Sequence, residues 1–205
     1  NDVAIANDSD ALIYERLLTE SGLLWPSLAD WWRERQSLTE QTAANRNLFL
    51  RLRAAVRATN SPGEIAIFET YYAHLAERMS DKLPALIPQV YLHYDPRTAN
   101  QRGVNRVLLR QRMDFLLLLN RGIRIVIEVD GKHHYARDDI ASPGKYAEMA
   151  AEDRRLKLQG YEVYRFGAAE FSDVEIIEGR YVVGPNSFKL IVAFFEKLFE
   201  RYAEK

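Results

Sequence analysis

Cysteine is absent from the 205 residues of the chain, and so are long hydrophobic runs and an excess of one charge. Without cysteine, a disulfide scaffold, a zinc finger and a cysteine nucleophile are excluded, and a reducing compartment such as the cytoplasm is favoured. The longest strongly apolar runs, 115–119 and 190–195, are too short for a transmembrane helix or a signal peptide, so we expect no membrane partner. With 28 basic and 29 acidic residues the net charge is -1, and nucleic-acid contact would need a local basic patch.

Common catalytic motifs are missing too. The chain has no G-x-x-x-x-G-K-[ST] or G-x-G-x-x-G phosphate-binding loop, no G-x-S-x-G nucleophile turn and no H-E-x-x-H metal motif. The composition, 47% hydrophobic and 28% charged, is that of a globular domain. Because the chain starts at Asn1 rather than Met, we also expect a further domain or a protein partner before that residue.

Apolar spacing and turn residues predict the order of the elements. We expect a helical extension over residues 1–60, with helices near 12–18, after Pro26 and over 38–58. A second unit, 61–205, begins with Ser61-Pro62-Gly63-Glu64, a capping box that opens a helix ending before Pro84 and Pro88. Strands are predicted over 90–94, 113–119, 123–129 and 161–166, and further helices over 145–159 and 187–202. This mixture predicts an α/β fold.

Arginines are concentrated in two segments. Six lie between residues 33 and 57 against two glutamates, which favours a solvated helix face over a surface that contacts phosphate. Residues 97–112 contain no acid, and their glycine and asparagines indicate a loop. We predict that this loop contacts nucleic-acid phosphates through Arg97, Arg102, Arg106, Arg110 and Arg112.

The predicted hairpin around Asn120-Arg121-Gly122 carries a concentration of carboxylates. A turn centred near Arg121 pairs residues whose numbers sum to 242, which sets Asp114 opposite Glu128, with Asp130 next on the same face. Directly opposed like charges destabilise a sheet, whereas a Mg²⁺ or Mn²⁺ ion would remove the conflict. The simpler interpretation is that Asp130 begins a turn and that Glu128 only ends a strand.

This order of residues resembles the PD-(D/E)xK, or restriction-endonuclease-like, nuclease superfamily, and within it the very-short-patch-repair endonucleases. The resemblance covers about residues 61–172. The matching residues are Ser61–Glu64, Pro88-Gln89, Met113–Phe115, Ile127–Gly131, His134-Tyr135, Asp153-Arg154, Leu156, Gly160-Tyr161, Val163 and Arg165-Phe166. The resemblance implies a core of a helix, a three-stranded meander, a helix and a strand. It also implies metal-dependent hydrolysis of phosphodiesters, with DNA as the expected substrate.

The resemblance also assigns roles to residues. Asp114, Glu128 and Asp130 match the metal ligands, and Lys132 would position the attacking water. Either Glu128 is the second acid of the motif, or Asp130-Gly131-Lys132 is its acid-x-Lys element, and the presence of Lys132 favours the latter.

Two further residues have both a functional and a structural interpretation. Glu64 matches a glutamate that assists the metal site, yet capping alone explains it. His134 would contact phosphate or shuttle a proton, although a lone histidine is usually structural. The pathway implied is repair, a mobile element or phage defence. The alternative function is a catalytically silent nuclease-fold module that binds nucleic acid or a protein.

Overall fold

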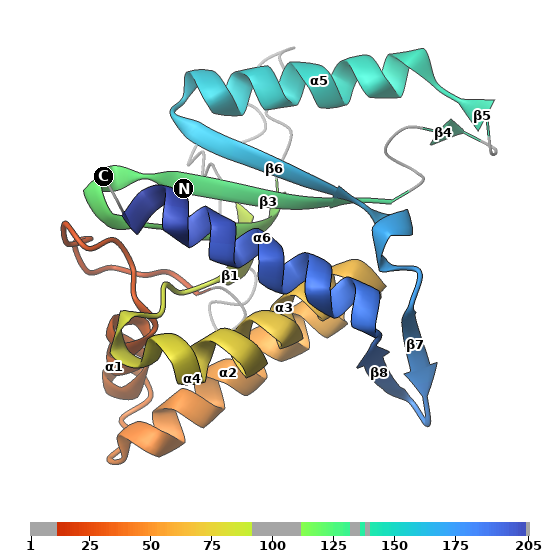
Figure 1. The fold of residues 1–205 in the computed structure, drawn as a ribbon. Coiled ribbons are helices and arrows are strands. Elements are labelled where there is room, and N and C mark those ends of the chain that lie inside the picture. The colour runs from red at the N-terminus through yellow and green to blue at the C-terminus, as the bar shows by residue number, and fades with distance from the viewer. Residues whose placement is uncertain (1–11, 92–111, 132–135, 138–139, 204–205) are drawn as a thin grey trace, which may run out of the picture.

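The computed structural model describes residues 12–91, 112–131, 136–137 and 140–203. They form several helices and a mixed sheet of four strands, so the predicted α/β class is confirmed (Figure 1).

Helices occupy the N-terminal part from residue 25. They are α1 (Trp25–Arg35), α2 (Gln41–Arg57) and α3 (Pro62–Thr70), which continues through a π-helical turn (Tyr71–Leu75) into α4 (Ala76–Met79) and a 3₁₀ turn (Ser80–Lys82). The helix predicted near residues 12–18 is wrong. Its leucines do not form a buried stripe, since Leu17 is 94% exposed. Shortly after this segment, the backbone of Leu23 forms hydrogen bonds to distant parts of the chain: its N–H donates to the carbonyl of Leu118, and its carbonyl accepts from the N–H of Ala85.

The central sheet has the strand order β1-β2-β3-β6. Its strands are β1 (Ile87–Tyr91), β2 (Arg112–Leu118), β3 (Arg124–Asp130) and β6 (Tyr161–Gly167). The first three form an antiparallel meander, and α5 (Pro143–Leu158) returns the chain so that β6 lies parallel to β3. The first strand begins earlier than predicted and contains Pro88, which is tolerated because β1 is an edge strand.

Smaller elements complete the fold. They are two short antiparallel pairs, β4 (Ala136–Arg137) with β5 (Ile140–Ala141) and β7 (Val174–Ile177) with β8 (Arg180–Val183), 3₁₀ turns at Asn120–Gly122 and Ala168–Phe171, and α6 (Pro185–Ala203). Two helices start after a serine cap: Ser61 accepts from the Glu64 N–H, and Ser142 accepts from the Lys145 N–H. The start of α6 is held by Asp173, which precedes β7 and accepts from the Asn186 N–H.

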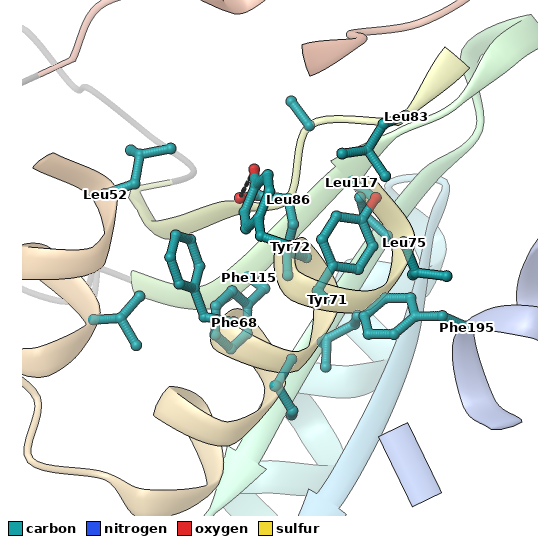
Figure 2. Packing of buried hydrophobic residues seen from close by; sticks show 14 of the residues in the cluster. Leu52, Phe68, Tyr71, Tyr72, Leu75, Leu83, Leu86, Phe115, Leu117 and Phe195 are labelled. Carbon is teal, nitrogen blue, oxygen red and sulfur yellow. Dashed lines mark hydrogen bonds between the residues drawn. The ribbon is translucent and has the colours of Figure 1, made fainter. Parts of the chain in front are cut away.

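The two faces of the sheet are covered unequally (Figure 1). Helices α1, α2, α3 and α6 pack one face and enclose a large apolar cluster, to which the sheet contributes Phe115 and Leu117. Figure 2 shows Phe68, Tyr71 and Phe195 at its centre. The other face, called here the α5 face, has a small buried cluster of Met113, Leu116, Val126 and Leu156.

The large cluster crosses the predicted boundary at residue 60, because it joins Leu48 and Leu52 of α2 to Phe68 of α3 and Phe115 of β2. Residues on both sides of that boundary therefore share one core. Within the described ranges, no helix is both long enough and apolar enough to span a membrane.

Candidate active site

The predicted register of the hairpin is confirmed. Phe115 pairs with Ile127 and Leu116 with Val126, so the paired numbers sum to 242 and the next step along the strands sets Asp114 opposite Glu128. Since Val126 belongs to the small cluster, strand alternation directs Glu128 and Asp130 to the α5 face as well. Asp114 lies at the same end of the sheet, where its side chain contacts the backbone of Val129. The hairpin thus brings the three predicted metal ligands to one end of the sheet, where their charges act on one another.

Asp114 is nearly buried, at 9% exposure. Its Oδ2 accepts a hydrogen bond from the Val129 N–H at 2.8 Å, which fixes the carboxylate against the end of β3. Burial raises the pKa of Asp114, while the Val129 bond and the nearby Arg112 lower it.

Glu128 is the carboxyl least able to ionise. Burial, and after it the charge of Asp114, raise its pKa to about 9. In the parallel register Glu128 lies beside Arg165 of β6, whose charge opposes this rise but does not cancel it. Glu128 therefore holds a proton at neutral pH unless another cation is present.

Asp130, by contrast, is already paired. Its Oδ1 accepts from Nη1 of Arg165 at 2.7 Å, and the same guanidinium binds Asp153 of α5 through Nε at 2.8 Å. The guanidinium thus joins β3, β6 and α5 at a largely buried position, with a side-chain exposure of 19%.

Glu64 reaches the same end of the sheet from α3. Its N–H caps the helix through Ser61 Oγ, but the return bond of a capping box is missing, because the Ser61 N–H donates to Thr59 Oγ1. The Glu64 carboxylate accepts from Gln89 Nε2 at 2.6 Å, and the side chains of Ser61 and Thr59 also hydrogen-bond to it. Burial, and after it Asp114, raise the pKa of Glu64 to about 7. Glu64 thus contacts both the cap of its own helix and the carboxylates at the end of the sheet.

Gln89 is a further polar residue at this end of the sheet to which the sequence analysis gave no role. The pairs Pro88–Phe115 and Val90–Met113 on either side set it opposite Asp114. Its φ is +56°, which costs on the order of 1–2 kcal/mol for a residue with a Cβ. Its Oε1 is buried and has no hydrogen-bond partner within the described part of the chain. The sequence signal for Gln89 was that Pro88-Gln89 is among the residues that match the nuclease superfamily. That match does not predict the φ angle of Gln89.

Several predicted residues lie outside the described ranges. These are Lys132, His134, Arg97, Arg102, Arg106 and Arg110. Of the predicted phosphate contacts, Arg112 is described: it opens β2, is exposed, and is close enough to lower the pKa of both Glu64 and Asp114. An exposed cation beside the carboxylates suits a phosphate contact.

Arginines of the N-terminal helices have partners within the fold. Arg33 pairs with Asp30 at 2.8 Å, and Arg53 and Arg57 share Glu69 at 2.9 and 2.8 Å. The burial of Glu69 raises its pKa, but the two arginines outweigh that effect and keep it low. These ion pairs support the interpretation of the arginines between residues 33 and 57 as part of a solvated helix face.

The donor types at the site suit Mg²⁺ or Mn²⁺, since carboxylate and amide oxygens are hard ligands. Among the described residues, however, no group of three or more histidine or acidic side chains stands ready as a complete ligand set. Asp130 is turned to Arg165 instead. Mg²⁺ commonly uses one or two carboxylates with waters and phosphate oxygens, so the remaining pair, Asp114 and Glu128, fits such an ion.

Comparison of the chain with protein-family models, with curated proteins and with solved structures gives no match.

Proposed function

We propose that the protein is a metal-dependent nuclease that hydrolyses phosphodiester bonds, with DNA as the substrate. The observation that carries the proposal is the gathering of Glu64, Asp114 and Glu128, three carboxyls whose pKa values burial raises, at one end of the sheet. Such an arrangement is unfavourable without a cation and is typical of functional sites. The order of a helix, an antiparallel meander, a helix and a parallel strand supports a restriction-endonuclease-like core.

The residues divide the work as follows. Asp114, Glu128 and, once released from Arg165, Asp130 would hold Mg²⁺ or Mn²⁺, which supplies a water of lowered pKa and charge to offset the phosphate. Arg112 binds a phosphate oxygen, and Lys132, by the family resemblance, orients the water. Ionised Asp114 and Glu128 are needed to hold the metal, so acid pH should inhibit the reaction.

The test is a cleavage assay on purified protein with plasmid, linear duplex, single-stranded DNA and RNA in Mg²⁺, Mn²⁺ or EDTA. Asp114→Asn is the matched variant, because an amide oxygen can still accept the Val129 N–H. We expect cleavage of DNA that needs the metal and falls at least about 10³-fold in the variant. Equal cleavage by the two proteins would refute the assignment.

One observation favours a second candidate, a catalytically silent nuclease-fold module that binds nucleic acid or a protein. The Arg165 guanidinium already neutralises Asp130, as an internal cation would in a site that has given up its metal. DNA binding without cleavage in either metal, and without any metal-dependent rise in melting temperature, is the result that this candidate predicts.

A further inference from the structure

Gln89 is held in a conformation that its own strand does not explain. Within β1 the residue has a φ of +56°, in the left-handed region that side chains with a Cβ rarely adopt. Strain of this kind persists where surrounding contacts enforce it, and it is concentrated at functional sites.

The contact that accompanies this conformation is with Glu64. Gln89 Nε2 donates to Glu64 Oε2 at 2.6 Å, across 25 positions of the chain and between β1 and α3. The strand register sets Gln89 opposite Asp114, and the charge of Asp114 acts on Glu64. The amide therefore lies between an acid of the helix and an acid of the hairpin.

The oxygen of the Gln89 amide also indicates a role at the metal site. Gln89 Oε1 is buried without a partner in the part of the chain described here. A buried acceptor of this kind is usually satisfied by water or an ion. Because Gln89 Oε1 belongs to an amide close to Glu64 and Asp114, the hydrogen-bond donor that would satisfy it is a water bound to the metal.

We propose that Gln89 is a positioning residue of the metal site, which fixes the Glu64 carboxylate beside Asp114 and offers its Oε1 to a water of the bound ion. The inference rests on the proposed nuclease function. It adds a residue that acts through Glu64, and it accounts for the strained strand as the arrangement that turns the amide toward the two acids.

The experiment measures Mn²⁺ affinity from the rise in melting temperature of the full chain, together with kcat on DNA. Two substitutions separate the side chain from the strain: Gln89→Gly removes both, and Gln89→Met keeps the length and the strain but removes the hydrogen bonds. Glu178→Gly is the matched control, because Glu178 has a φ of +50° in the exposed β7–β8 turn, away from the site.

We expect both Gln89 variants to bind Mn²⁺ about 10- to 100-fold more weakly and to lose kcat with little change in KM. Without metal, Gln89→Gly should melt at or above the wild-type temperature, and Glu178→Gly should keep wild-type affinity. In a Glu64→Gln background, Gln89→Met should weaken Mn²⁺ binding much less, since the two residues act together.

Three results would overturn the inference. If wild type responds to Mn²⁺, Asp114→Asn does not, and both Gln89 variants respond like wild type, then only the role of Gln89 fails. If Gln89→Gly lowers the melting temperature and leaves affinity unchanged, Gln89 is structural. If wild type itself shows no response to Mn²⁺, the proposed function fails and the role of Gln89 fails with it.

Discussion

The two faces of the β1–β2–β3–β6 sheet differ in how they treat polar groups. On the face covered by α1, α2, α3 and α6, the buried hydroxyl of Tyr71 donates to the carbonyl of Pro84. That of Tyr72 donates to the carbonyl of Leu86 (Figure 2). On the α5 face, Glu128 is largely enclosed beside Asp114 with too little positive charge nearby. One face thus supplies stability, and the other keeps an unfavourable concentration of charge, which is expected of a functional surface.

The difference extends to how each face is covered. The large cluster is closed by aromatic packing, as between Tyr71 and Phe195, whose ring centroids are 4.6 Å apart. Helix α5 buries a single residue, Leu156, and exposes Tyr146 and Leu158. The ion pairs of Arg165 with Asp130 and Asp153 therefore carry an unusual share of the attachment of α5.

The largest effect on stability should come from the densely packed face. Phe115→Ala removes a fully buried ring and should lower the free energy of unfolding by about 3–5 kcal/mol. Leu156→Ala on the α5 face should cost about 2 kcal/mol, because its few neighbours can relax around the cavity. Urea unfolding of both variants measures the difference, and a larger loss for Leu156→Ala would contradict the comparison.

The next effect concerns the ion pairs that hold α5. Arg165→Met leaves Asp130 and Asp153 without their shared partner in a largely buried place, and we expect a loss of about 2–3 kcal/mol. Hydrogen exchange should show α5 amides losing protection before those of α3. Uniform loss of protection in both helices would mean that Arg165 does not act on α5 in particular.

The α5 face should also set the pH dependence of stability without metal. The folded-state pKa of Glu128 is about 9, above its ordinary value of 4.5, so the folded state binds a proton that the unfolded chain releases between these pH values. Stability should therefore fall as pH rises from 4.5 to 9, by up to about 1.4 kcal/mol per unit. Glu128→Gln should flatten this slope, and Mg²⁺ or Mn²⁺ should reduce it in wild type. If the pH dependence of stability is the same in Glu128→Gln as in wild type, the proton that the folded state binds is not on Glu128.

The smallest effect is expected on the outer side of α5. Leu158→Ala changes a side chain that is 89% exposed and should alter the free energy of unfolding by less than about 0.5 kcal/mol. Urea unfolding beside Leu156→Ala, two positions away, tests whether burial explains the contrast within one helix. Equal losses would show that Leu158 is covered in solution.

Local sequence patterns predicted the strand register and the helix start around the site, but they did not predict the side-chain contacts there. The hairpin register followed from a short turn at Asn120–Gly122 between two apolar runs, and the start of α3 followed from Ser61 and Pro62. The helix near residues 12–18 failed because its leucine spacing is not matched by burial, which depends on contacts made elsewhere in the chain.

The conformation of Gln89 could not be predicted, because it depends on Glu64, 25 residues earlier and on another element. The pairing of Asp130 with Arg165 depends on the parallel docking of β6 beside β3, which strand patterns alone do not fix. Sequence therefore indicated which acids gather at the site, and the structure indicates which of them are paired.

The most direct test of the account is the free energy of unfolding of Asp114→Asn without metal, measured beside wild type at neutral pH. If the carboxylates are kept for chemistry, removing one charge while retaining the acceptor for Val129 should raise stability by about 1 kcal/mol in a protein that no longer cuts DNA. A loss of stability in Asp114→Asn would contradict the account, because it would make the carboxylate a structural group of the fold.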